Sequence, residues 1–77
     1  MFIFSQRLRE LRNQAGESRE DLGKVIGVSV SQISELENDR KGTTMERLVL
    51  LCKHYRVSSD YLLGLTDDPS PYKEEKQ

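Results

Sequence analysis

The sequence predicts an all-α fold, a single small domain of five helices. Apolar residues recur at spacings of three and four along most of the chain, the period of a helix with one buried face. Serine or threonine precedes several of these segments and can cap them, and glycine follows several. Only VSVSQIS has a strand-like alternation, and its capping serine, the glycine before it and the flanking helices favour a helix there.

The first helix is predicted from about Ser5 to Ala15. Its apolar residues fall on one helical face: Phe4, Leu8, Leu11 and Ala15. Gly16 follows them and is expected to end the helix.

Residues Arg19 to Asn38 predict two short helices joined at Gly27, which has no Cβ and permits the left-handed conformation of a sharp turn. Apolar residues predicted to face inward are Leu22, Val25, Ile26, Ile33 and Leu36, with Val28 bridging the helices. Gly23 lies inside the first helix at a cost of about 0.5–1 kcal/mol relative to alanine. We expect close packing of the second helix at Gly23 to compensate.

Both short helices begin with a capping box. Ser18 can cap the first with Asp21 three residues later, and Ser29 can cap the second with Gln32. Two capped helices across one glycine, with small polar residues facing outward from the second, form the outline of a helix-turn-helix. This outline points to DNA.

Two further helices are predicted. Thr43 and Glu46 form another possible capping box, and the helix after it has one apolar stripe: Met45, Leu48, Leu51, Cys52 and Tyr55. Ser58 can cap a short last helix that ends at Gly64 and contains Tyr61, Leu62 and Leu63.

The domain organisation follows from where the apolar period stops. Residues 1–66 are predicted to form the domain, and residues 67–77 a flexible polar tail with two prolines. This tail is either a natural end or a hinge to an effector domain outside these residues. The chain has 77 residues, which leaves little room for a pocket, and stability should be modest without a partner.

Composition restricts the function classes. One cysteine excludes an internal disulfide, there is no long apolar run, and the MFIF start is too short for a signal peptide, so we expect a cytoplasmic protein with no membrane partner. Cys52 and His54 point to nearly opposite sides of a helix, which argues against a metal, a cofactor or a catalytic dyad. We therefore expect no enzyme.

Net charge argues weakly against DNA, because twelve basic and thirteen acidic residues give −1. The tail from Asp67 is net −2, so the body before it is net +1. Few phosphates can be neutralised by each subunit, and affinity should depend on dimerisation.

The body from Phe4 to Asp68 resembles the Cro/C1-type (XRE-like) helix-turn-helix family of phage repressors and small bacterial transcriptional regulators. The matching segments are RLRELR, SREDLGKVIGVSVSQISELEN and RLVLLCKHYRVSSDYLLGLTDDP. The resemblance implies a compact lambda-repressor-like bundle that binds double-stranded operator DNA as a homodimer, with the third helix in the major groove. Two half-sites of a near-palindrome would then lie about 34 Å apart.

The resemblance implies a base-facing set on the third helix: Ser29, Val30, Ser31, Gln32, Ser34 and Glu35. Gln32 can form a bidentate contact with adenine, and Val30 can pack on a thymine methyl group. Glu35 departs from the many relatives with a basic or amide residue. It either accepts a hydrogen bond from cytosine N4 or faces away from the DNA.

Phosphate contacts implied by the resemblance come from Arg19, Asn38, Arg40 and Lys41. Arg19 begins the second helix, where relatives commonly have a glutamine and where the helix N-terminus adds a positive partial charge. Asp39 replaces the usual glycine after the asparagine, and aspartate tolerates positive φ better than most residues. Without the motif beside it, this loop would be only a charged surface turn.

Two further roles follow from the resemblance and from the position of the last helix. Arg12 and Glu37 correspond to an internal salt bridge that holds the first helix against the third, so Glu37 should not contact DNA. Candidate dimer contacts are Tyr61, Leu62 and Leu65, with a contribution from Phe2 and Ile3. The alternative is that these residues complete the monomer core, and this alternative is favoured for Leu62.

Three functions remain compatible with the sequence. The first is a repressor of phage or mobile-element type that occupies an operator overlapping a promoter. The second is an antitoxin or restriction-modification controller, with a toxin or anti-repressor as a possible protein partner. The third is a protein-interaction module that has kept the fold and lost DNA binding, for which the acidic balance is the best support.

Overall fold

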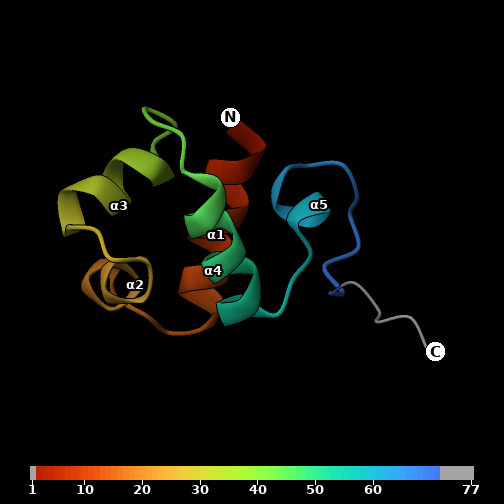
Figure 1. Cartoon of the computed structure of the whole chain (residues 1–77), viewed down its shortest axis with the longest axis horizontal. Helices are drawn as coiled ribbons and strands as arrows, with labels where there is room; N and C mark the ends of the chain where they lie inside the picture. Colours follow the sequence, from red (N-terminus) through yellow and green to blue (C-terminus); the bar gives the residue numbers. More distant parts are fainter. Residues whose placement is uncertain (1, 72–77) are drawn as a thin grey trace.

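The computed structural model describes residues 2–71, with only the backbone of Phe2, and this part of the chain contains five α-helices and no strand (Figure 1). The helices are α1 (Phe2–Gln14), α2 (Arg19–Ile26), α3 (Val30–Glu37), α4 (Met45–Tyr55) and α5 (Ser59–Leu62). The predicted all-α, five-helix fold is therefore confirmed. Residues 72–77 of the predicted tail lie outside the described residues.

Helix α1 differs from its predicted bounds at both ends. It begins at Phe2 rather than Ser5, because Phe4 and Ser5 are buried within its first turns. It ends at Gln14, and Ala15 is an exposed turn residue instead of the last member of the apolar stripe. The chain then turns through Gly16 with a φ of 70°.

The turn between α2 and α3 has the predicted chemistry. Gly27 ends α2 with φ 74° and ψ 36°, the left-handed region that glycine adopts without strain. Gly23 is explained by the backbone of this turn, since a Cβ there would lie 2.5 Å from the Val28 carbonyl oxygen. Ile33 of α3 is farther from that position, at 3.8 Å, so the turn, more than α3, requires the glycine.

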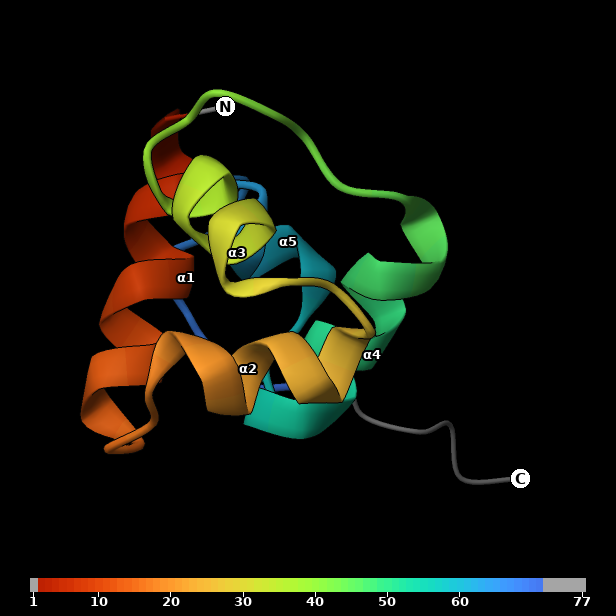
Figure 2. The same cartoon turned by 90° about the vertical axis from the view of Figure 1, so that its left-hand side faces the viewer.

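The core lies where α1, α2 and α4 meet α3 and α5, and Figure 2 shows α2 and α3 side by side between α1 and α4. It consists of nine buried apolar residues: Phe4, Leu8, Leu22, Ile26, Ile33, Leu36, Leu51, Val57 and Leu62. Burying a side chain of this size contributes about 1.5–3 kcal/mol, so this set holds the two helices of the motif in one orientation.

Helix α4 has its N-cap one residue later than predicted. Thr44 is the cap, and its Oγ1 accepts a hydrogen bond from the Arg47 backbone N–H at 3.1 Å. A reciprocal capping box needs a side-chain acceptor at the third helical residue. With Thr44 as the cap, this residue is Arg47 and not Glu46, so the predicted box does not form. The predicted stripe also loses Met45, which is 84% exposed.

Helix α5 has the predicted N-cap, Ser58, but it ends at Leu62. Leu63, which was predicted to lie within the helix, is a turn residue before Gly64, whose φ is 83°. Arg7 of α1 connects to the segment after α5. Its guanidinium lies 4.2 Å from the centre of the Tyr61 ring and donates to the Thr66 carbonyl at 2.7 Å and to Asp67 Oδ1 at 2.8 Å. The first residue of the predicted tail thus contacts the helical body.

Candidate nucleic-acid interface

The outward surface of α3 consists of small polar side chains around one valine. Ser29, Ser31 and Gln32 are exposed, and Val30 is 47% exposed. Ser34 and Glu35 are half-buried farther along the helix. No long basic side chain stands on this surface, so another molecule can approach the helix closely.

Ser29 and Gln32 form the predicted capping box. The Gln32 backbone N–H donates to Ser29 Oγ at 3.2 Å, and the Ser29 backbone N–H donates to Gln32 Oε1 at 2.9 Å. The amide oxygen of Gln32 is therefore engaged by the helix start, and a bidentate contact with adenine requires the cap to open. With the cap intact, only the amide nitrogen can contact a base.

Ser34 and Asn38 interact with each other at the end of α3. Asn38 Nδ2 donates to the Ser34 carbonyl at 2.9 Å and lies 3.3 Å from Ser34 Oγ. The Asn38 backbone N–H also donates to the Ser34 carbonyl. Asn38 thus satisfies a carbonyl at the helix C-terminus, which its predicted phosphate role does not include.

Glu35 is paired with the following loop. Lys41 Nζ lies 3.8 Å from Glu35 Oε1, and both side chains are substantially exposed. An exposed pair of this kind contributes about 0–1 kcal/mol, so it directs the two side chains more than it stabilises the fold. Asp39 in the same loop has a φ of 59°, as the replacement of glycine predicts.

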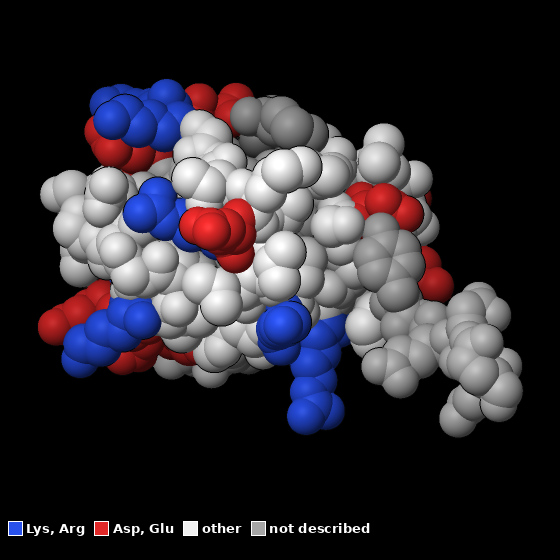
Figure 3. All heavy atoms as spheres, viewed as in Figure 1, with Lys and Arg blue, Asp and Glu red and all other residues white. Residues whose placement is uncertain are grey.

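Arg47 is a candidate that the sequence reasoning missed. It lines a small hollow of about 80 Å³ together with Gln32, Glu35 and Lys41, so α4 contributes to the surface beside α3. Figure 3 shows Lys and Arg gathered with Asp and Glu at the end of the molecule formed by α2 and α3. The only signal for Arg47 in the sequence was its place in the first turn of α4.

The predicted salt bridge between Arg12 and Glu37 is present and buried. Arg12 donates from Nε to Glu37 Oε2 at 2.5 Å and from Nη2 to Glu37 Oε1 at 3.2 Å. The Arg12 Nη1 group donates to the Glu17 carbonyl at 2.8 Å. The hydrogen bond to Glu37 raises the pKa of Arg12 above its ordinary value, which keeps the guanidinium charged. This pair joins α1 to α3.

Arg19 is a second partner of the same carboxylate, which the sequence reasoning did not foresee. Its Nε donates to Glu37 Oε1 at 3.1 Å. The Glu37 side chain is 0% exposed, whereas that of Arg19 is 44% exposed. One buried carboxylate therefore lies between two guanidinium groups, from α1 and from α2.

No group of three or more His, Cys, Asp and Glu side chains is placed to hold a metal ion between residues 3 and 71. Burial raises the pKa of the Cys52 thiol, which keeps it protonated and weakly nucleophilic.

Tyr55 OH donates a hydrogen bond to Glu17 at 2.7 Å. Burial of the phenol, and to a smaller extent this hydrogen bond, raises the pKa of Tyr55. Its contact joins α4 to the loop before α2.

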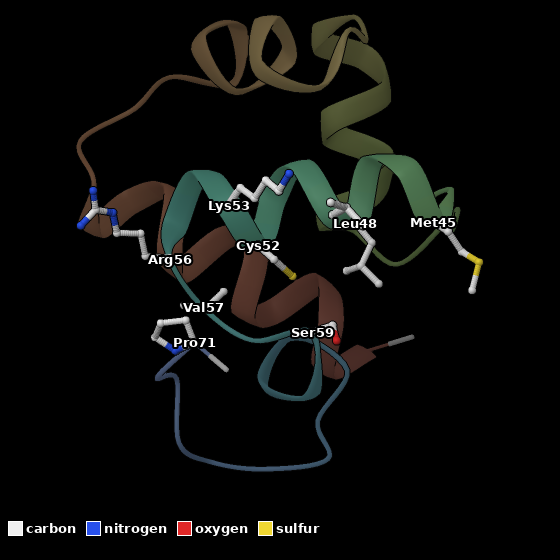
Figure 4. Close-up of a pocket in the computed structure, with 9 residues that line it drawn as sticks. Met45, Leu48, Cys52, Lys53, Arg56, Val57, Ser59 and Pro71 are labelled. Atoms are coloured by element: carbon white, nitrogen blue, oxygen red, sulfur yellow. The ribbon is translucent and has the colours of Figure 1, made fainter. Parts of the chain in front are cut away.

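An apolar groove runs along α4 (Figure 4). It has a volume of about 650 Å³, with Leu48 and Cys52 on one wall and Val57 and Pro71 on the other. Basic residues Lys53 and Arg56 stand at one end of the groove, and exposed Met45 stands at the other. Val49, also on this side, is 50% exposed.

The candidate dimer residues have different environments. Leu62 is fully buried in the core, so its predicted place in a dimer interface is wrong and the favoured alternative holds. Tyr61 is half-buried under Arg7, while Leu65 and Ile3 are exposed. The side chain of Phe2 lies outside the described residues.

In the part of the chain that the structure describes, no helix has the length and apolar character needed to cross a membrane.

Comparison with known proteins identifies the class of this domain. The helix-turn-helix family profile matches residues 8–62, which include the capping boxes, the Gly27 turn and every core residue except Phe4. The chain is 42% identical over 74 residues to the HTH-type transcriptional regulator YobD of Bacillus subtilis (strain 168). That match covers 96% of this chain and 66% of YobD, so the chain spans just under two thirds of this relative.

Solved structures agree with this class. The P22 c2 repressor in complex with a synthetic operator superposes with a TM-score of 0.72 at 34% identity, over 77% of this chain and 89% of the repressor. The restriction-modification controller protein C.AhdI from Aeromonas hydrophila gives a TM-score of 0.70 at 28% identity, over 79% and 92% of the two chains. The chain belongs to the helix-turn-helix family, in its Cro/C1 type, as the sequence predicted.

Proposed function

We propose that this protein is a sequence-specific DNA-binding transcriptional regulator, of the repressor type, that places α3 in the major groove. The observation that supports this most directly is the surface of α3, a row of small exposed polar side chains whose helix is fixed from below by the buried Glu37. A helix fits the major groove and contacts base edges when its outward side chains are short and can hydrogen-bond.

Base contacts in this proposal come chiefly from Val30, Ser31 and the amide nitrogen of Gln32. Val30 is apolar and half-exposed, which suits a thymine methyl group, and Ser31 is exposed. Ser29 and Ser34 lie at the edges of this set, and both accept hydrogen bonds within the helix. For Glu35 we favour the second alternative, in which it is directed toward Lys41 and away from the bases.

Phosphate contacts are assigned to residues around α3. Arg40 and Lys41 are exposed in the loop after it, Arg19 begins α2, and Asn38 supports the loop through Ser34. Asp21 already accepts the Ser18 backbone N–H at the start of α2. Because the chain's own carboxylate is at this helix N-terminus, a phosphate there depends on Arg19 more than on the helix dipole.

Dimerisation is proposed to use the apolar surface of α4, a change from the predicted contacts at α5. An operator with two-fold symmetry requires an interface that pairs one patch with itself. If two copies of α4 pack antiparallel across their grooves, Glu46 of one copy approaches the end with Lys53 and Arg56 of the other. Exposed Met45 and Val49 then become buried, and Leu65 stays a peripheral candidate.

Selection of bound duplexes from a random DNA pool with the full chain tests the proposal. We expect enrichment of a near-palindrome with half-site centres about one helical turn apart. Enrichment of no sequence at low salt by a folded dimer would contradict it and would favour the protein-interaction module.

A restriction-modification controller is the second candidate, because the superposition on C.AhdI is nearly as good as that on the P22 c2 repressor. Both candidates share DNA binding and differ in the regulated gene. Mapping the selected sequence onto the genome distinguishes them, since a controller's site would lie upstream of a restriction endonuclease gene.

A further inference from the structure

The cluster of Arg12, Arg19 and Glu37 contains two positive charges and one negative charge. Each of the three Arg12 guanidinium nitrogens has a partner, because Nε and Nη2 donate to Glu37 and Nη1 donates to the Glu17 carbonyl. Arg12 alone therefore neutralises the buried carboxylate. The charge of Arg19 is left over, on a side chain that is substantially exposed at the start of α2.

Glu37 engages the Arg19 guanidinium through one nitrogen, Nε. This Nε donates to Glu37 Oε1, and the planar group places the two Nη atoms on the other side, away from that bond. A guanidinium fixed in this way presents two parallel donors, the geometry that matches two oxygens of a phosphate. The buried Glu37, itself fixed by Arg12, sets the direction of this pair.

We propose that Glu37 is a positioning residue for a DNA phosphate: it orients Arg19 so that both Nη groups meet one phosphate of the operator backbone, in register with α3. The proposal rests on the proposed function and deepens it. Glu37 then affects DNA affinity without contacting the DNA. Its carboxylate fixes α3 through Arg12 and orients the phosphate donor Arg19.

Arg19→Lys tests this, because lysine keeps the charge but concentrates its donors on one nitrogen. That nitrogen can stay at Glu37 or reach a phosphate, and it cannot span both as the guanidinium does. Affinity is measured on the duplex selected from the random pool. We expect the decrease in the logarithm of the affinity caused by Arg19→Lys to be at least half of the decrease caused by Arg19→Ala. Arg19→Ala should also reduce the dependence of affinity on salt.

Arg9→Lys is the matched control, since Arg9 is exposed on α1, is assigned no contact with DNA and forms no ion pair with an acidic side chain among residues 3–71. It should bind within twofold of wild type, and thermal unfolding of Arg19→Lys should resemble that of wild type because Arg12 still pairs with Glu37. Affinity of Arg19→Lys within twofold of wild type would overturn the positioning role. Failure of wild type to bind any duplex would instead overturn the proposed function.

Discussion

Val30 and Val49 are almost equally exposed, at 47% and 50%, yet the helices around them differ in what they present. Val30 on α3 is surrounded by serines and Gln32, whereas Val49 on α4 stands beside exposed Met45 and Leu50. Single exposed apolar residues are ordinary, and only a contiguous apolar patch indicates a protein partner. The comparison teaches that the neighbours of an exposed valine, more than its exposure, indicate whether it contacts bases or another subunit.

The largest effect is expected beneath α3. Glu37→Ala leaves the buried Arg12 guanidinium without its carboxylate, and we expect the free energy of unfolding to fall by about 3–5 kcal/mol. Urea denaturation monitored by circular dichroism measures this. Glu46→Ala on exposed α4 is the control and should change stability by less than about 1 kcal/mol. Unchanged stability of Glu37→Ala with altered base preference would mean that Glu37 contacts DNA.

The next effect separates the two valines. Val49→Asp places a charge in the proposed dimer interface, and we expect a monomer whose operator affinity is lower by about 100-fold, with stability changed by less than about 0.5 kcal/mol. Sedimentation equilibrium and electrophoretic retardation measure the two quantities. Val30→Asp should leave the oligomeric state unchanged while abolishing specific binding. A Val49→Asp protein that stays dimeric would remove α4 from the interface.

A smaller effect is expected from Gln32→Glu on the surface of α3. Glutamate still accepts the Ser29 backbone N–H, so the cap persists, but the amide donor is lost. Because only the hydrogen bond donated by the Gln32 amide is lost, discrimination between bases should change by about 1 kcal/mol, roughly fivefold. Repeating the selection with the variant measures this change. Equal preferences in the variant and wild type would assign Gln32 to capping alone.

The smallest effect is expected at the two capping boxes. The box of α2 contains the titratable residue Asp21, whereas the box of α3 contains Gln32. Hydrogen bonds from Ser18 hold the pKa of Asp21 below its usual value of 3.8. Its stabilisation is therefore present above that pH and is lost as the pH falls through the lower folded-state pKa. Thermal unfolding between pH 7 and pH 2 should show a smaller pH-dependent loss in Asp21→Asn than in wild type. Parallel curves would mean that the Asp21 bond contributes nothing.

The sequence by itself determined the local features of this protein. The caps at Ser18, Ser29 and Ser58 and the left-handed turn at Gly27 follow from side-chain and backbone chemistry within four residues. The Arg12 and Glu37 pair was also predictable, but through the family resemblance. The roles of the residues on the outward surface of α3 stay predictions.

Only the tertiary structure decided the features that depend on what packs against what. A helical period places Met45 and Leu51 in one stripe, but in the folded chain Leu51 is fully buried and Met45 is exposed. Nothing local indicates that Arg19 reaches Glu37 across 18 residues. Burial and shared ion pairs depend on contacts distant in sequence, which is why the apolar groove on α4 became visible only in the folded chain.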